Sequence, residues 1–292
     1  MDWNRALPTW PMSELSRRVR CRPHQWHVQE AGSERDRPTL LLLHGAGAST
    51  HTWRDMIPPL EQKYHVVALD LPGQGFTKLG PRNRCGLVPM AQDIALLCQD
   101  QGWAPSVIIG HSAGAAIALH LSRILPNSPR IVGINAALGR FDGVASWLFP
   151  LLAKVLSLTP LTALAFTAGG NPTARARRLI EGTGSQLPPD GLALYGRLVS
   201  DRDHVDGVLQ MMSQWDVGPL LDALPQINAP CLLLTGDKDS AVAPQVSAKA
   251  VRALPHATLQ SLGALGHLAH EEDPALVTRR IFDWIAQTDS GS

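Results

Sequence analysis

The sequence carries almost no excess charge. Lys and Arg number 26 against 25 Asp and Glu, which gives a formal net charge of +1. A long-range field that would attract nucleic acid or an anionic membrane is therefore not expected. Residues 1–20 contain no apolar run that leads to a small-residue cleavage site. A secretory leader is thus not predicted, and the expected location is cytoplasmic.

Cysteine is also sparse. Cys21, Cys85, Cys98 and Cys231 lie far apart and form no Cys-x-x-Cys pair. This spacing excludes the usual zinc knuckle and dithiol redox motifs. Cys98 and Cys231 lie in apolar stretches, where a cysteine more often acts as a small buried hydrophobic residue than as a nucleophile. Reduced thiols are therefore expected.

Short apolar runs bounded by glycine alternate with longer helical patterns, which is typical of βα units. At 45% hydrophobic and 17% charged residues, the composition is that of a globular protein. The pattern predicts an α/β fold with a mostly parallel central sheet flanked by helices, and an antiparallel edge hairpin over residues 17–30. Buried strands are expected at residues 39–44, 66–71, 107–110, 131–134, 231–235 and 258–262, and helices at residues 53–62, 88–101, 115–125 and 274–287.

This alternation stops between Gly139 and Ile227, where one helix would suffice to connect two strands. We therefore predict a core formed by residues 1–138 and 226–292, and an inserted helical cap formed by residues 139–225.

Part of the insertion, residues 147–166, is strongly apolar. A transmembrane helix needs about 20 apolar residues, but Pro150, Lys154 and Pro160 interrupt this run, and a span would separate strands of one sheet. A cap wall over an apolar pocket is the preferred interpretation, and peripheral membrane contact stays open. The candidate substrate contacts in this wall are Trp147, Leu148 and Phe149.

A G-x-S-x-G motif, Gly110-His111-Ser112-Ala113-Gly114, lies between a predicted strand and a predicted helix. Three fixed positions would match by chance in about 0.1 of chains of this length, so the motif gains weight from its context. A sharp strand-to-helix turn would hold the Ser112 hydroxyl clear of the sheet, at the positive end of the helix dipole. The motif predicts Ser112 as a nucleophile; the alternative is a tight βα turn.

A serine nucleophile needs a base that takes its proton and an acid that orients the base. Asp237 and Asp239 follow one predicted strand, and His267 follows the last one. The three candidates thus occur in the order Ser, Asp, His, which is one of the known chain orders of a catalytic triad. Asp239 is preferred over Asp237 as the acid, because the pattern resembles that of hydrolases that place the acid three residues beyond such a glycine, as Asp239 is placed after Gly236. Asp237 is then a turn residue.

An oxyanion needs two backbone N–H donors, for which Ala46 and Ala113 are the candidates. Ala46 lies in a glycine-rich loop that lacks the Gly-Lys-Ser/Thr of a phosphate loop. His270, three residues after His267, raises the alternative of a metal pair, but no further ligands cluster in the sequence. The predicted mechanism requires neither a metal nor an organic cofactor.

The segments HGAGAST, DLPGQGFT, GHSAGA, GDKDSAV and GHLAHEEDP occur in the order seen in the α/β-hydrolase superfamily, which the chain resembles over nearly its whole length. The resemblance implies the α/β-hydrolase fold, with Ser112 as nucleophile, His267 as base, Asp239 as acid, and Ala46 and Ala113 as oxyanion donors.

A narrower resemblance is carried by MDWNRALPTWP, HGAGASTHTWRD, GINAALG and GVASWLFP. These segments are similar to the magnesium-chelatase accessory proteins of bacteriochlorophyll biosynthesis. This resemblance implies a photosynthetic bacterium, a role near magnesium insertion into protoporphyrin, and magnesium chelatase as a partner. It implies no particular reaction.

Serine rather than aspartate at position 112 favours ester or related acyl chemistry over dehalogenase or epoxide hydrolase chemistry. An apolar cap would suit a large flat apolar ligand such as a tetrapyrrole. The sequence therefore predicts a serine hydrolase acting on a bulky apolar substrate. The rival hypothesis is a non-enzymatic porphyrin-binding or chelatase-assembly protein that keeps the hydrolase fold.

Overall fold

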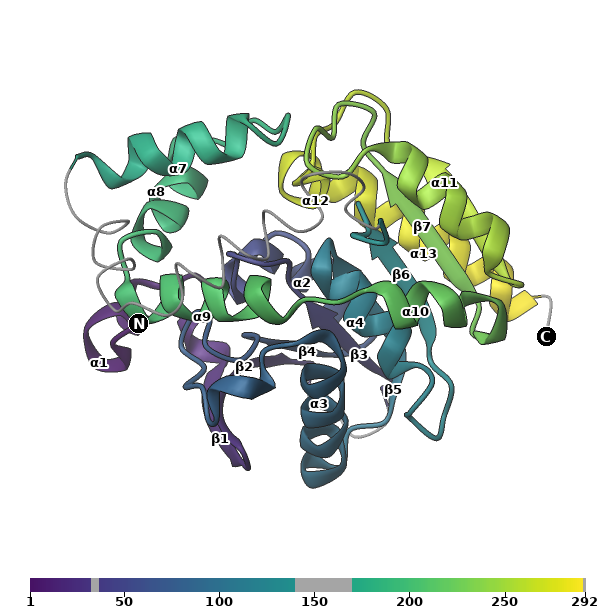
Figure 1. Ribbon diagram of the computed structural model, residues 1–292, viewed down its shortest axis with the longest axis horizontal. Coiled ribbons are helices and arrows are strands. Elements are labelled where there is room, and N and C mark those ends of the chain that lie inside the picture. The colour runs from purple at the N-terminus through teal and green to yellow at the C-terminus, as the bar shows by residue number, and fades with distance from the viewer. Residues whose placement is uncertain (33–36, 140–169, 291–292) are drawn as a thin grey trace.

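A computed structural model describes residues 1–32, 37–139 and 170–290. Its centre is an eight-stranded sheet of order β1-β2-β4-β3-β5-β6-β7-β8, with helices on both faces (Figure 1). Strands β1 and β2 form an antiparallel hairpin, β2 also pairs with β4 antiparallel, and all other neighbours are parallel. The predicted fold class is confirmed. The strands are β1 Ser16–Cys21, β2 His24–Ala31, β3 Thr39–Leu43, β4 His65–Leu69, β5 Pro105–His111, β6 Arg130–Ile134, β7 Cys231–Thr235 and β8 Ala257–Ser261.

Two of the predicted helices are shorter than expected, and the last one, predicted over residues 274–287, extends to Ser290. Residues 53–62 form the short 3-10 helix η3 (Thr50–Trp53) and the helix α2 (Ile57–Glu61), because Pro58 and Pro59 begin a helix more readily than they continue one. The third predicted helix ends at Leu121, before Pro126. The other α-helices are α1 Trp3–Ala6, α3 Leu87–Gln101, α4 Ala113–Leu121, α7 Pro172–Glu181, α8 Pro189–Leu198, α9 Arg202–Gln214, α10 Gly218–Ala223, α11 Pro244–Ala253, α12 Ala269–Glu272 and α13 Pro274–Ser290.

The core lies on both faces of the sheet. In β3, Leu41 and Leu43 belong to the cluster that includes side chains of α3 and α4, whereas Leu40 and Leu42 belong to the cluster that includes side chains of α2 and α13. Because both faces of a parallel strand are covered, its sequence is a continuous apolar run and not an alternating one. All four cysteines are buried and free.

The described part of the insertion between β6 and β7 contains α7, α8, α9 and α10, which we call the inserted helices. Figure 1 shows α7 and α8 at the upper left, α11 and α13 at the right, and α12 between these two groups. Trp147, Leu148 and Phe149, with the rest of residues 147–166, lie outside the described residues. Among the helices that are described, none is both long and apolar enough to cross a membrane.

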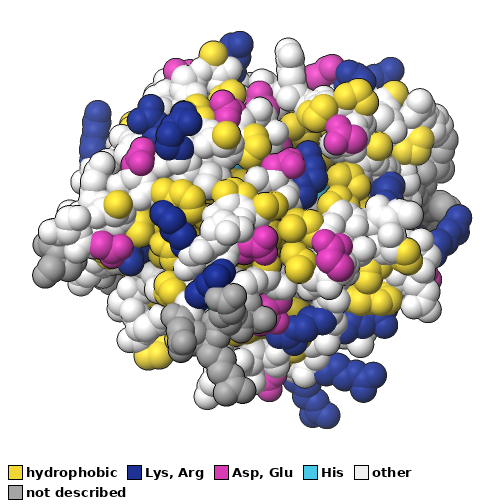
Figure 2. Space-filling view, turned by 180° about the vertical axis from the view of Figure 1, so that it is seen from behind, with side chains coloured by type: hydrophobic (Ala, Val, Ile, Leu, Met, Phe, Trp, Pro, Cys, Tyr) yellow, Lys and Arg dark blue, Asp and Glu magenta, His cyan; other side chains and the backbone are white. Residues whose placement is uncertain are grey.

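One face of the molecule shows no separation of charge by sign. Figure 2 shows the face behind that of Figure 1, where acidic and basic side chains are interspersed with apolar ones over most of the area. This mixture agrees with the net charge of +1.

A buried carboxylate, Asp70, holds the loop after β4 against neighbouring segments. Its two oxygens accept hydrogen bonds from the backbone N–H groups of Thr50 and Phe76, each at 2.7 Å. The ring of His27, on β2, lies 2.6 Å from the same carboxylate. Burial alone would raise the pKa of Asp70, but the charge and the hydrogen bond of His27 outweigh it and bring the pKa down to about 2.

We expect Asp70 to make the protein sensitive to acid. The unfolded chain binds a proton at the ordinary pKa of 3.8, whereas the folded chain binds it only near 2. Stability from this group is therefore present above pH 4 and is lost as the pH falls towards 2, by about 2 kcal/mol. Urea unfolding of the wild type and of Asp70→Asn at pH 5 and pH 2.5 measures this. We expect the difference in unfolding free energy between the two proteins to shrink at the lower pH, and a constant difference would contradict this role of Asp70.

Candidate active site

Ser112 lies at the turn between β5 and α4, in a backbone conformation that L-residues rarely adopt, with φ 52° and ψ −115°. The glycines of the motif explain how this turn fits. A Cβ at Gly110 would lie 2.4 Å from the carbonyl of Gly114, and one at Gly114 would lie 2.1 Å from the carbonyl oxygen of Leu43. The start of α4 therefore packs directly on β3 and β5, and the strained turn presents the partly exposed Ser112 at the helix start.

Asp239 and His267 meet at the same edge of the sheet. Nδ1 of His267 lies 2.8 Å from Oδ2 of Asp239, and both residues are largely buried. The other carboxylate oxygen accepts the backbone N–H groups of Ala241 and Val242, each at 2.8 Å. Asp237 is placed differently, because it is exposed and accepts a hydrogen bond from Ser261. The structure thus pairs His267 with Asp239.

Asn135, directly after β6, joins the acid to the histidine loop. Its Nδ2 donates to Oδ2 of Asp239 at 2.6 Å and to the carbonyl of Gly266 at 3.1 Å. Like Ser112, it has a positive φ, here 48°. Sequence reasoning missed this residue. Its signal was a polar side chain at the carboxyl end of a buried parallel strand, where neighbouring strand ends bring their loops together.

His111 connects the Ser112 turn with the histidine loop. Its Nε2 lies 2.9 Å from the backbone carbonyl oxygen of His267, and the two rings lie 4.7 Å apart, centre to centre. Since a carbonyl can only accept, His111 donates this bond. Burial, followed by the charges of His270 and His267, lowers the pKa of His111 well below the ordinary histidine value, so its ring stays neutral. The contact places the residue beside Ser112 against the segment that carries His267.

The two predicted oxyanion donors lie in the two loops that meet at Ser112. Ala113 is the first residue of α4, a position whose N–H has no partner within a helix. Ala46 is exposed in the turn that the hydrogen bond from Ala48 to Gly45 closes. That turn approaches the serine closely, because a Cβ at Gly45 would lie 3.0 Å from Cβ of Ser112. The arrangement suits a carbonyl oxygen held between the two loops.

A buried polar network surrounds Glu271, four residues after His267. Tyr195 of α8 and Thr52 each donate a hydroxyl bond of 2.6 Å to Oε1, and Arg54 donates to Oε2 at 2.7 Å. Burial raises the pKa of Glu271, although the charge of Arg54 opposes that effect. The network joins an inserted helix to the core beside the candidate site.

His270 belongs to the same region. Its Nε2 lies 2.6 Å from the Thr52 hydroxyl, and burial, followed by the charges of His267 and Arg54, lowers its pKa to about 3. Within the described ranges, no three His, Cys, Asp or Glu side chains are grouped so that they could hold a metal ion.

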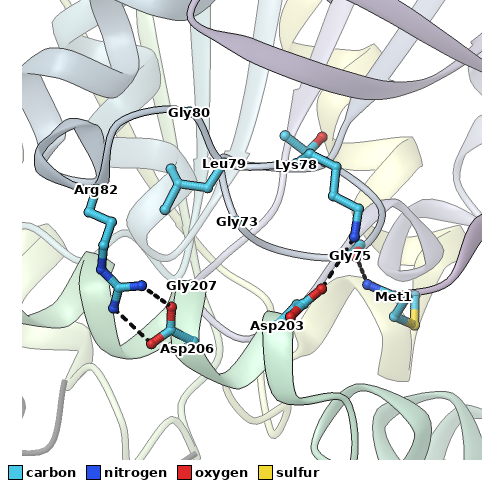
Figure 3. A pocket seen from close by; sticks show the side chains of 11 residues that line it. Met1, Gly73, Gly75, Lys78, Leu79, Gly80, Arg82, Asp203, Asp206 and Gly207 are labelled. Atoms are coloured by element: carbon cyan, nitrogen blue, oxygen red, sulfur yellow. Dashed lines mark hydrogen bonds and ion pairs between the residues drawn. The ribbon is translucent and has the colours of Figure 1, made fainter. Parts of the chain in front are cut away.

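A separate cavity of about 250 Å³ lies between α9 and the loop after β4 (Figure 3). Arg82 and Lys78 on the loop side pair with Asp206 and Asp203 on α9. The helix approaches the loop so closely that a Cβ at Gly207 would lie 2.0 Å from the carbonyl oxygen of Gly73. Because these charges bind one another, we assign the cavity to the packing of α9 on the core.

The chain is similar to several known proteins in sequence and in structure. The sequence profile of the family described as alpha/beta hydrolase fold matches residues 38–274. The magnesium-chelatase 30 kDa subunit of Rhodobacter capsulatus is 47% identical over 96% of this chain and 98% of its own length. A pimeloyl-[acyl-carrier protein] methyl ester esterase of Neisseria meningitidis is 26% identical over 86% of this chain and 79% of its own. A thermophilic esterase from Thermogutta terrifontis superimposes with a TM-score of 0.74 at 20% identity, over 93% of this chain and 98% of its own.

Proposed function

Because this chain belongs to the α/β-hydrolase family, we propose that it is a serine hydrolase that cleaves an ester or related acyl bond of a bulky apolar substrate. The observation that carries the proposal is the buried hydrogen bond between Asp239 and His267, beside the strained turn of Ser112. A scaffold protein has no physical need for this combination of groups.

In the proposed reaction, Oγ of Ser112 attacks the carbonyl carbon while Nε2 of His267 takes the hydroxyl proton. The N–H groups of Ala46 and Ala113 bind the resulting oxyanion. When the carbon–oxygen bond to the leaving group breaks, His267 returns the proton to the departing alkoxide. Water then attacks the acyl-serine in the same way, and Asp239 stabilises the imidazolium in both steps.

We propose that the substrate is a tetrapyrrole and that the protein acts in the cytoplasm. Its proposed role is accessory, near the magnesium-chelatase step of bacteriochlorophyll biosynthesis. The similarity to a protein named as a magnesium-chelatase subunit supports this role. We further propose that residues 139–225 form a cap, with Trp147, Leu148 and Phe149 among its substrate contacts, since apolar walls recognise flat apolar ligands.

The same similarity supports a second function. A protein named as a subunit can act by assembly alone, so this chain could bind a porphyrin or the chelatase without turnover. The two functions differ in what happens to a bound ester.

A porphyrin methyl ester separates these functions. We expect the wild type to bind it, detected by a change in porphyrin absorbance, and to release methanol and the free acid in repeated turnovers. Short aryl esters serve as the control, because they test whether the site accepts any small ester. They should be hydrolysed with a higher KM than the porphyrin ester. Binding without methanol release would support the assembly function, and absence of binding would exclude a tetrapyrrole ester as substrate.

A further inference from the structure

The link between α7 and α8 contacts both loops of the candidate site, although it is distant from them in sequence. We call its first four residues, Gly182, Thr183, Gly184 and Ser185, the strap. Figure 1 shows the turn that contains them at the end of α7 that faces α12. Its contacts fall on the residues directly before and after Asp239 and His267.

On the acid loop, the strap contacts Ser240 and Lys238. The backbone N–H of Ser240 donates to the carbonyl of Thr183 at 3.1 Å, and its hydroxyl donates to the carbonyl of Gly182 at 2.9 Å. Gly184, with φ +83°, packs so closely that a Cβ there would lie 1.9 Å from the carbonyl oxygen of Lys238. Asp239 is therefore held from both sides.

On the histidine loop, the contacts fall on Leu268 and Gly266. The backbone N–H of Leu268 donates to Oγ of Ser185 at 2.7 Å, and Ser185 is fully buried. A Cβ at Gly266 would lie 2.4 Å from the carbonyl of Gly184 and 2.5 Å from the Ser185 hydroxyl oxygen. His267 is held in the same manner as Asp239.

We propose that the strap positions the acid and the histidine relative to each other, and that Ser185 is a positioning residue for the proposed hydrolase reaction. The inference rests on the proposed function, since positioning matters only where His267 acts as a base. It also gives the link between two of the inserted helices a role in the proposed reaction. The alternative is that the strap only fastens the inserted helices to the core.

We expect the Ser185 hydroxyl to matter because it accepts the hydrogen bond of the buried Leu268 N–H. Ser185 is buried, so the Leu268 N–H has no water to bind when the hydroxyl is removed. The residue next to His267 is then free to shift. A displacement of about 1 Å at a catalytic base can slow a reaction by about a hundredfold.

Ser185→Ala tests the proposal by two readouts. We expect the rate of labelling by a fluorophosphonate to fall by about tenfold or more. Amide hydrogen exchange, read by mass spectrometry, should become about fivefold faster in residues 263–268, where Ser185 accepts its hydrogen bond, and also in residues 236–242, which the strap joins through Thr183 and Gly182. The matched control is Ser122→Ala, which removes another buried hydroxyl, hydrogen-bonded at 2.8 Å to Leu119 and remote from both loops. Its labelling should be unchanged.

Labelling within twofold of the wild type, or faster exchange in residues 263–268 alone, would overturn the positioning role and leave a fastening contact. If Ser185→Ala fails to fold, Ser240→Ala replaces it, because that side chain is exposed and loses only its bond to Gly182. The same two readouts then decide, with the same expected directions.

Failure of the proposed function gives a different pattern. In that case the wild type itself is not labelled, while the exchange measurement still reports whether the strap holds the two loops together. Coupled exchange in both loops without labelling would show that the strap holds the two loops together, and it would reject the serine nucleophile and with it a role of the strap in catalysis.

Discussion

Replacement of His267 by alanine is expected to lower kcat/KM for ester hydrolysis by about 10⁶-fold, the magnitude seen when a serine hydrolase loses its base. His267 is the proposed base. The other described groups that are hydrogen-bonded to Asp239 are an amide side chain and two backbone N–H groups, which cannot accept a proton from Ser112 at neutral pH. The fold should survive, because the His267 side chain is at the surface edge of the site, 11% exposed, and bonds only to Asp239 among the described side chains.

Steady-state hydrolysis of an aryl ester measures this effect, with His256→Ala as control, since His256 is an exposed histidine in the same part of the chain. That variant should keep wild-type activity. Combining His267→Ala with Ser112→Ala should cost little more than either change alone, because the two residues act as one unit. A His267→Ala enzyme within tenfold of the wild type would refute the role of this residue.

Asp239→Asn is expected to lower kcat by about 10⁴-fold while leaving KM nearly unchanged. The carboxylate faces four donors, from Asn135, His267, Ala241 and Val242. An amide has only one acceptor oxygen, so its NH₂ group must face at least one donor. If it faces His267, the imidazole adopts the wrong tautomer and its Nε2 can no longer accept a proton.

The matched control is Asp237→Asn, two residues away and exposed, where the amide can still accept the Ser261 bond. Its kcat should lie within about twofold of the wild type. A larger loss in Asp237→Asn than in Asp239→Asn would reverse the assignment of the acid.

The positions of the strands could be predicted from the sequence because burial on both faces demands continuous apolar runs. The segment TLLLL is β3, and β5 and β7 are of the same kind. Helix ends were less accurate, since Pro58 and Pro59 delay the start of α2, and α4 already ends at Leu121, before the proline that was expected to stop it. Helix α11 was not predicted at all, because its half-buried pattern, with Ser247 and Ala250 inside, has few large apolar residues to mark it.

The candidate site could be predicted only where local sequence carries the signal. Ser112 has its motif, and Asp239 and His267 each follow a strand and a glycine. Their roles stay predictions, although the structure brings the acid and the histidine into contact. Asn135 carries only the general signal of a polar side chain after a buried strand, and Ser185 carries none. Their roles come from contacts with residues about a hundred positions away, which only the folded chain defines.

The most direct test of the account is the site at which a fluorophosphonate reacts. Such a probe bonds only to a serine that a neighbouring base has activated. We predict one phosphonylated residue, located by mass spectrometry of the digested protein at Ser112, no label in Ser112→Ala, and strongly reduced labelling in His267→Ala. An unlabelled wild type, or a label that persists in Ser112→Ala, would contradict a serine hydrolase centred on Ser112 and favour the ligand-binding accessory function.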